Sequence, residues 1–314
     1  MEKMKTYCFG IDVGGTSVKC GLFHTDGTLV EKWEIPTRTE NNGQNILPDV
    51  AETINAKLAE KNIDKADVEG VGIGIPGPIN SRGEAACAVN LYWGFTPVAQ
   101  ILGDLTGLKA QAGNDANVAA LGEAWKGAAA GAQNIIMVTL GTGVGGGIII
   151  DGKIVAGSHG AGGEIGHALV VRDEAEKCNC GNHGCLEQYA SATGIVRVAG
   201  RMLAASDDDS TLRELQNITA KDVLDAFKAG DAVAVRVMEY VGDLLGGAIA
   251  GFATVADPEA IVIGGGVSKA GQPLIDCIEK YYQRYAFPSC KETPIVLATL
   301  GNDAGIYGAA KMVL

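Results

Sequence analysis

The sequence of 314 residues lacks several features that mark particular classes of protein. It contains no run of about 18 apolar residues, the length that a membrane-spanning helix requires. Its first residues, MEKMKTYCFGIDVGG, include no apolar stretch of signal-peptide length. Acidic residues outnumber basic ones, and the net charge of −12 opposes binding to nucleic acid or to an anionic membrane. We therefore expect a cytoplasmic protein with no nucleic-acid partner and no membrane association.

Two nucleotide-binding fingerprints are absent as well. The P-loop pattern G-x-x-x-x-G-K-[ST] does not occur, and no G-x-G-x-x-G follows the first predicted strand. The second absence disfavours a dinucleotide enzyme. Apolar residues nevertheless form 47% of the chain, which is enough to build a core, so we expect a folded protein of one large domain or two smaller ones.

Glycine-rich turns occur at three predicted strand ends: DVGGT (12–16), LGTGVGGG (140–147) and IGGGV (263–267). A glycine has no side chain, so its backbone N–H group can approach a phosphate closely. Asp12, at the end of the first predicted strand, is well placed to hold Mg²⁺ through water, because hard cations prefer oxygen ligands. The residues predicted to contact phosphate are Gly14, Gly15, Thr16, Gly141, Thr142, Gly143, Gly264, Gly265 and Gly266.

Strand and helix patterns alternate along the chain, which indicates an α/β fold. Three short strands at 6–11, 18–23 and 28–34 predict an antiparallel meander, and the same order of strands and turns returns from NIIMVTL onward. This repetition suggests an internal duplication, with two domains packed around a cleft. The main predicted helices cover 48–62, 96–107, a segment beginning at Asn114 or Asp115, 219–229, 231–256, 272–285 and a last stretch from about 303.

The segment CNCGNHGC (178–185) holds three cysteines and one histidine in eight positions. In a reducing compartment such a cluster is more typical of a metal site than of disulfides. Cys178, Cys180 and Cys185 supply three thiolates for a tetrahedral zinc, and either His183 or His167 can be the fourth ligand. A Cys₃His set leaves no open position, so this zinc would be structural. The scattered cysteines are expected to be small buried apolar residues: Cys8, Cys20, Cys87, Cys277 and Cys290.

Six segments, in this order, resemble the signatures of the ROK family, most closely those of its bacterial glucokinases. They are FGIDVGGTSVKCGLF, GIPGPI, NDANVAALGEAWKGA, LGTGVGGGIIIDGKI, HGAGGEIGH and CNCGNHGCLEQYAS. The resemblance implies the two-lobed actin-like ATPase fold of sugar kinases and Hsp70, with ATP in an interlobe cleft and the sugar at its base. It implies a small N-terminal lobe of residues 1–113 plus about 301–314, and a large C-terminal lobe of 114–300 that carries the zinc loop.

The resemblance also assigns roles to individual residues. In NDAN, Asp115 is implied as the general base for the sugar hydroxyl, with Asn114 beside it as a hydrogen-bonding partner. The residues alone allow a simpler role for Asn114 or Asp115, as the cap of the following helix. The family pattern selects His167 rather than His183 as the fourth zinc ligand. The implied sugar contacts are Gly77, Asn90, Asn114, Asp115, Glu164, His167 and Glu187.

The implied activity is ATP-dependent phosphorylation of glucose at the 6-hydroxyl, giving glucose 6-phosphate, by a homodimer or homotetramer. An alternative is a ROK kinase for N-acetylmannosamine, N-acetylglucosamine or fructose, because the same side chains can bind several hexoses. A sugar-responsive ROK regulator is a remote alternative: such regulators carry an N-terminal DNA-binding domain, and only about six residues precede the first predicted strand. An ATPase without a sugar substrate would leave Glu164, His167 and Glu187 unused.

Overall fold

The computed structural model describes residues 5–314 and divides the chain into two compact α/β units. Unit 1 comprises the chain up to Gln133 together with Gly147–Gly163 and Thr299–Leu314, and unit 2 comprises Asn134–Gly146 and Glu164–Ala298. The α/β class predicted from the sequence is confirmed. The implied lobe boundary after residue 113 falls inside unit 1, because the helix that follows it packs against the C-terminal helix of the same unit.

Unit 1 is built on a mixed sheet with the strand order β3-β2-β1-β4-β5. Strands β1, β2 and β3 pair antiparallel, as the predicted meander requires, whereas β4 pairs parallel to β1 and β5 pairs parallel to β4. The strands are β1 (Tyr7–Val13), β2 (Ser17–His24), β3 (Leu29–Pro36), β4 (Val68–Ile75) and β5 (Ala110–Asn114). Its helices and turns are α1 (Ile46–Glu60), η1 (Lys65–Asp67), η2 (Val89–Leu91), α2 (Val98–Thr106), α3 (Asp115–Lys126), η7 (Gly301–Asp303) and α9 (Ala304–Met312).

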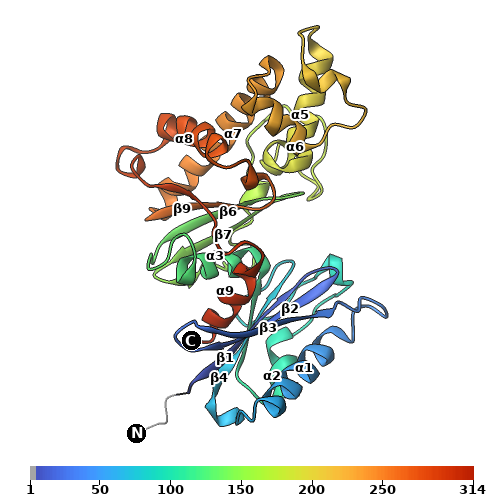
Figure 1. Ribbon diagram of the computed structural model, residues 1–314, viewed down its shortest axis with the longest axis vertical. Coiled ribbons are helices and arrows are strands. Elements are labelled where there is room, and N and C mark those ends of the chain that lie inside the picture. Colours follow the sequence, from blue (N-terminus) through green and yellow to red (C-terminus); the bar gives the residue numbers. More distant parts are fainter. Residues whose placement is uncertain (1–4) are drawn as a thin grey trace. The chain divides into compact units, whose positions relative to one another are not determined.

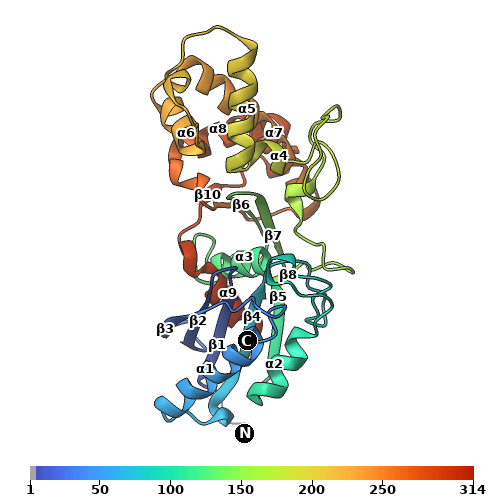
Figure 2. The same cartoon turned by 90° about the vertical axis from the view of Figure 1, so that its right-hand side faces the viewer.

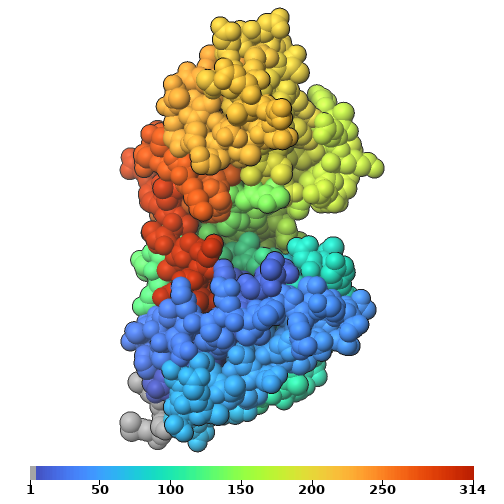
Figure 3. Space-filling model, turned by 45° about the vertical axis from the view of Figure 1, so that its right-hand side comes forward, coloured from blue at the N-terminus to red at the C-terminus, as the bar shows by residue number. Residues whose placement is uncertain are grey.

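Helices cover both faces of this sheet, since successive strand residues point to opposite sides. Phe9, Ile11 and Val13 of β1 face a core shared with α1 and α2, which lie side by side in Figures 1 and 2. Cys8, which precedes Phe9 in β1, and Phe23 of β2 face a second core formed with α9. The last helix of the chain therefore covers one face of the first sheet, and Figure 3 shows red C-terminal atoms against blue N-terminal ones.

Glycines allow α9 to approach its neighbours closely. A Cβ atom at Gly72 of β4 would lie 1.7 Å from the backbone oxygen of Ala309, and one at Gly308 would lie 1.7 Å from that of Val118 in α3. No side chain fits at such distances, so α9 can pack against the sheet and α3 only because these positions carry none.

Unit 2 contains the parallel strands β6, β9 and β10, within a sheet of order β10-β9-β6-β7-β8. Strand β7 begins in unit 2 and ends in unit 1, where β8 pairs with it. The strands are β6 (Ile135–Leu140), β7 (Val144–Ile150), β8 (Lys153–Ile154), β9 (Ala260–Gly264) and β10 (Ile295–Leu297). The helices and turns are η3 (Ile165–His167), α4 (Glu187–Ala190), α5 (Ala192–Ala205), η4 (Thr211–Glu214), α6 (Ala220–Lys228), α7 (Ala232–Ala256), η5 (Val267–Ala270), α8 (Gln272–Tyr285) and η6 (Pro288–Cys290).

The predicted helices of this region are confirmed within a residue at each end, but α5 was not predicted. Its sequence contains Gly194 and Gly200 and several β-branched residues, all of which lower helix propensity. The helix forms because Ser191 caps it, accepting a hydrogen bond from Gly194 N at 3.0 Å, and because its apolar face is buried. No helix within residues 5–314 combines the length and the apolar character needed to cross a membrane.

The loop that leads into α9 is held by a fully buried carboxylate, that of Glu123 in α3. Its oxygens accept hydrogen bonds from Leu300 N at 2.8 Å, Thr299 N at 3.1 Å and Ala128 N at 2.7 Å. Three chain segments of unit 1 thus meet at one charged side chain. Hydrogen bonds to a buried charge are among the stronger ones in proteins.

We expect Glu123→Ala to lower the free energy of unfolding by about 2–4 kcal/mol, because three backbone N–H groups lose their acceptor. The exposed Glu60, paired only with lysines, is the matched control, and Glu60→Ala should change stability by less than about 0.5 kcal/mol. Urea denaturation followed by circular dichroism measures both. Equal stability of the two variants would contradict the role assigned to Glu123.

Candidate active site and metal cluster

The turn between β1 and β2 is exposed, and Asp12 lies at its base in unit 1. Gly14 N donates to Ser17 O at 3.0 Å, and the Thr37 hydroxyl donates to Gly14 O at 2.7 Å, so the turn is anchored on both sides. Burial raises the pKa of Asp12 to about 6; Lys19 opposes this rise and the nearby charge of Asp115 adds to it. The structure therefore brings Asp12 and Asp115, two predicted site residues, into one electrostatic environment.

Asn114 ends β5 and Asp115 begins α3. The Asn114 side chain caps the helix by accepting a hydrogen bond from Asn117 N at 3.1 Å, and it donates to Gly77 O at 3.1 Å. Asp115 Oδ1 accepts from Ala116 N at 2.9 Å, within the first turn, where the helix dipole favours a negative charge. The cap is thus Asn114 and not Asp115, and the same amide ties the Gly77 turn to the start of α3.

The loop after Gly77 holds the other sugar contact predicted in unit 1. Asn90 lies exposed in η2. Trp93 is buried in the core of unit 1 and donates from Nε1 to Gly43 O at 3.2 Å, whereas Phe95 is exposed. Cys87, in the same loop, is exposed, which corrects the expectation that all the scattered cysteines are buried.

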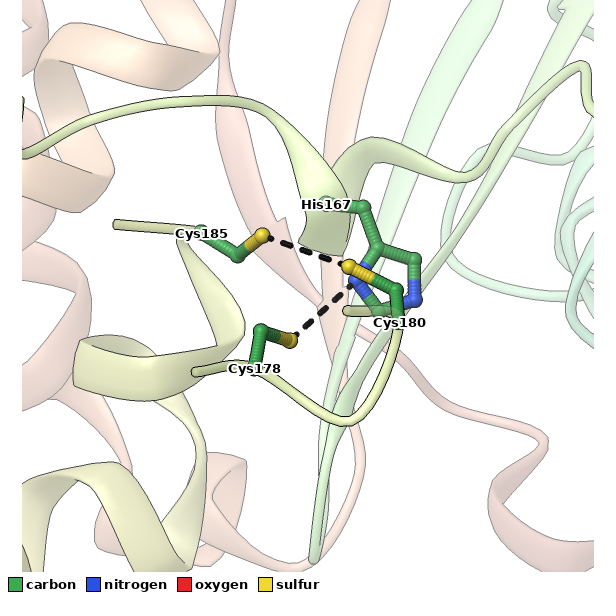
Figure 4. A group of neighbouring side chains, drawn as sticks. All are labelled: His167, Cys178, Cys180 and Cys185. Atoms are coloured by element: carbon green, nitrogen blue, oxygen red, sulfur yellow. Dashed lines mark hydrogen bonds between the residues drawn. The ribbon is translucent and has the colours of Figure 1, made fainter. Parts of the chain in front are cut away.

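His167, Cys178, Cys180 and Cys185, named here the Cys₃His cluster, point toward one another in unit 2 (Figure 4). Their ligand atoms all lie within 4.8 Å of one another. Cys180 Sγ is 3.6 Å from Cys185 Sγ, and Cys178 Sγ is 3.7 Å from His167 Nδ1. The eight cysteines, all in the described part of the chain, are free thiols. His183 lies apart, its Nδ1 3.0 Å from Glu174 O.

The cluster fits a tetrahedral zinc in both donor type and spacing. Zn–S bonds of about 2.3 Å at tetrahedral angles separate two sulfurs by about 3.8 Å, close to the distances within the cluster. Burial raises the pKa of the Cys178 thiol and raises that of Cys185 to about 12, whereas a backbone hydrogen bond from Asn182 lowers that of Cys180. Zinc binding would therefore displace protons from these thiols.

Glu164, His167 and Glu187 gather beside this cluster, all within unit 2. His167 Nε2, on the far side of the ring from the cysteines, lies 4.0 Å from Glu164 Oε2. Glu187 Oε1 is 3.8 Å from Cys178 Sγ, and its Oε2 accepts from Val144 N at 3.0 Å. The arrangement places one imidazole nitrogen and two carboxylates beside the Cys₃His cluster, a set that can hydrogen-bond several hydroxyl groups.

The turn between β6 and β7 connects these carboxylates to the predicted phosphate contacts. A Cβ atom at Gly143 would lie 2.2 Å from Glu187 Oε2, so a glycine there lets the glutamate side chain take this position. Ala192 N and the Thr193 hydroxyl, which follow α4, donate to the oxygens of Gly141 and Thr142 at 2.8 and 3.0 Å. The turn and α4 are therefore held together by several short contacts.

A cavity of about 660 Å³ opens in unit 2 beside this turn, a size typical of small-molecule sites. It brings together three predicted phosphate contacts, Gly141, Thr142 and Gly266, and it has an apolar wall from Leu224 and Val267. The full lining is Gly141, Thr142, Ala192, Thr219, Ala220, Lys221, Leu224, Asp225, Lys228, Gly266, Val267, Lys269 and Ala270.

The residues from α6 in this cavity were missed by sequence reasoning. Asp225 accepts from Lys221 at 2.6 Å and pairs with Lys228 at 2.8 Å, which lowers the pKa of its carboxyl to about 2. On an amphipathic helix such charges look like an ordinary solvated face, so no motif could have identified them.

The family comparison matches the ROK family over residues 8–314. A glucokinase of Halalkalibacterium halodurans is 43% identical over 309 residues, covering 97% of this chain and 94% of that protein. The structure of a ROK hexokinase from Thermus thermophilus aligns with a TM-score of 0.82 and 31% identity, covering 97% of this chain and 96% of the other. A ROK family glucokinase from Streptomyces griseus, solved with glucose and AMPPNP, aligns with a TM-score of 0.72 and 33% identity over 98% of both chains.

We expect the purified protein to contain about one zinc per chain, measured by inductively coupled plasma mass spectrometry, because the Cys₃His cluster supplies a full tetrahedral set. His167→Ala should lose most of that zinc. His183→Ala should retain it and is the matched control from the same loop. Zinc lost from the His183 variant and kept by the His167 variant would show that the ligand set is wrong.

Proposed function

The chain belongs to the ROK family, and from this premise we propose that it is a hexose kinase that transfers the γ-phosphoryl group of ATP to the 6-hydroxyl of glucose. The observation that carries the proposal is its full-length similarity to glucokinases, joined to the grouping of Glu164, His167 and Glu187 beside the Cys₃His cluster. The proposal includes a cytoplasmic location and a homodimeric or homotetrameric assembly.

The sugar is bound by hydrogen bonds to its hydroxyl groups. Glu164 and Glu187 accept from neighbouring hydroxyls, and His167 Nε2 takes part while its Nδ1 faces the cysteines. Asn114, Gly77 and Asn90 of unit 1 are further proposed sugar contacts. The hydrogen bond from Asn114 to Gly77 O supports a shared role for these two residues. The Streptomyces griseus relative was solved with glucose, which supports this class of ligand.

Asp115 acts as the general base on the attacking hydroxyl. The hydroxyl becomes acidic only as its bond to phosphorus forms, so the reaction does not require a strong base. Asp12 is the proposed contact for Mg²⁺: it offers a carboxylate at the base of an exposed glycine turn, and a pKa of about 6 leaves it mostly ionised at neutral pH. Positioning and charge, rather than covalent chemistry, supply the catalysis.

ATP occupies the cavity beside the β6–β7 turn. Its glycines suit the phosphates, the wall formed by Leu224 and Val267 suits a base, and lysines balance the negative charge. The Cys₃His cluster would hold zinc with no open coordination position, so the metal would keep the loop that carries the sugar contacts in one shape.

A panel of sugars with ATP tests the proposed substrate. Glucose should give a kcat/KM at least about tenfold above N-acetylglucosamine, N-acetylmannosamine and fructose, since a pocket built for one hydroxyl pattern discriminates by hydrogen bonds. Coupled detection of ADP measures each rate. A preference for an N-acetyl sugar would replace glucose by that sugar, and an absence of ADP release with every hexose would reject the kinase.

Asp115→Asn should lower kcat by about a thousandfold, because a general base is worth about 10²–10⁴ in rate, while KM for glucose stays within a few-fold. Asp104→Asn is the matched control, an exposed aspartate of α2 in the same unit, and it should keep full activity. Steady-state kinetics measure kcat and KM of both variants. A kcat for Asp115→Asn above about a tenth of the original would show that Asp115 is not the general base.

A further inference from the structure

Glu174 lies in the loop between His167 and Cys178. Its charged side chain is buried, although the proposed reaction gives it no role. Its side chain is 2% exposed. Its oxygens accept two hydrogen bonds from Arg201, at 2.8 and 3.0 Å, and others from Arg197, at 3.3 Å, and from the Tyr189 hydroxyl. These donors hold the pKa of the Glu174 carboxyl well below its usual range, Arg201 most strongly. A carboxylate bound by so many donors fixes the position of its loop.

Glu176 completes a cluster in which two negative and two positive charges balance. It pairs with Arg197 at 3.1 Å and with Arg201 at 2.7 Å, and both arginines project from α5. The Glu174 charge can be buried without a large penalty because the cluster is neutral overall and Arg201 binds the carboxylate through two nitrogens. The segment carrying Glu174 and Glu176 is thereby fastened to a long helix of unit 2.

The same segment is fastened to α4, the short helix that begins with Glu187. Tyr189 of α4 donates to Glu174, and the Gln188 side chain donates to Glu176 O at 3.0 Å. Gln188 Oε1 accepts from Cys185 N at 3.1 Å, and Gln188 O accepts from Arg197 at 2.7 Å. The two residues that follow Glu187 are therefore both held by the Glu174–Arg197–Arg201 cluster or by its neighbours.

We propose that Glu174 is a positioning residue for Glu187: through Tyr189, Gln188 and the two arginines it sets the place of α4 and so of the carboxylate that binds the sugar. This inference rests on the proposed function, because it takes Glu187 as a sugar contact. It identifies an anchor distinct from the metal, since Cys185 holds α4 on its N-terminal side and Glu174 holds it on the C-terminal side. His183, which is not in the Cys₃His cluster, serves this anchor with a ring nitrogen 3.0 Å from Glu174 O.

Four side chains must meet for this anchor to exist: Glu174 from the loop, Tyr189 from α4, and Arg197 and Arg201 from α5. Arg197 also stacks over the Tyr189 ring, with its guanidinium 5.1 Å from the ring centroid. The cluster fixes α4 through Cys185 at its N-terminal side, and the attachment through Tyr189 fixes the other side of the helix. A displacement of about 1 Å in a substrate-binding group is enough to weaken catalysis markedly.

Glu174→Gln tests the proposal on the full-length, zinc-loaded enzyme. We expect KM for glucose to rise about tenfold or more, with kcat and KM for ATP within about twofold and zinc unchanged at about one per chain. Asp173→Asn is the matched control, an exposed acid one position away, and it should leave all four values unchanged. An unchanged KM for glucose, an equal rise in both KM values or a loss of zinc would each overturn the assignment, because a merely structural role would not raise the KM for glucose alone.

Tyr189→Phe keeps the ring and removes only the hydroxyl that reaches Glu174, so it tests the proposal even if Glu174→Gln fails to fold. It should raise KM for glucose about two- to fivefold with zinc retained, and no change would count against the proposal. Glu187→Gln separates this inference from the proposed function. If Glu187→Gln leaves KM for glucose unaltered, the role of Glu187 as a sugar contact fails; if it raises KM but the Glu174 and Tyr189 variants do not, only the positioning role fails.

Discussion

The close approach of α9 to the first sheet and to α3 is the constraint on which unit 1 depends. A Cβ atom at Gly72 or Gly308 would overlap the backbone of the neighbouring element, so α9 packs this closely only because both positions are glycine. Two catalytic candidates are fixed as a result. Gly305, in the first turn of α9, lies against the Asp12 carboxylate, where a Cβ atom would be 2.5 Å from Cγ. Helix α3, packed on α9, begins with Asp115. The C-terminal helix α9 thus helps to position Asp12 and Asp115, which lie in the first half of the chain.

In unit 2 the corresponding constraint is electrostatic. Thiols of the Cys₃His cluster and the carboxylates of Glu164 and Glu187 crowd into one region, and Cys178 Sγ lies only 3.8 Å from Glu187 Oε1. As a thiol Cys178 can donate to that oxygen, but as a thiolate it would repel it. A divalent cation bound at the cluster would resolve the conflict, because it would stabilise the thiolates while Val144 N–H holds the other carboxylate oxygen. A metal held by the Cys₃His cluster would therefore affect the Glu187 carboxylate through charge as well as through the loop.

Sequence patterns were enough to predict the features that depend on residues close together in the chain. Alternating strands, amphipathic helices and capping residues follow from nearest neighbours, and the meander of β1 to β3 and helices α6 to α8 were found that way. The three cysteines of the Cys₃His cluster were also within reach, since their type and spacing indicate a metal site. The choice of His167 over His183 came from the resemblance to the ROK family. What sequence could not supply was contact between distant residues. Glu123 accepts a hydrogen bond from Leu300, 177 positions away, and Asp225 lines one cavity with the β6–β7 turn. No local sequence pattern predicts either contact. Helix α5 was missed because its burial, not its propensity, makes it helical.

The glycine turns, treated as one class in the sequence, divide into two in the structure. Gly265 is required by the fold, since its φ is +85° and a Cβ atom there would lie 2.5 Å from Leu140 O in the backbone. A Cβ atom at Gly143 would lie 2.2 Å from Glu187 Oε2 and would displace that side chain. At Gly15 and Gly266 a Cβ atom would meet nothing within 4 Å, and at Gly141 its nearest neighbour would be 3.9 Å away. Packing does not explain these three. Gly141 and Gly266 are also the ones that line the 660 Å³ cavity, and Gly15 lies in the exposed turn beyond Asp12. A ligand that needs bare backbone explains a glycine where the protein itself leaves room for a side chain.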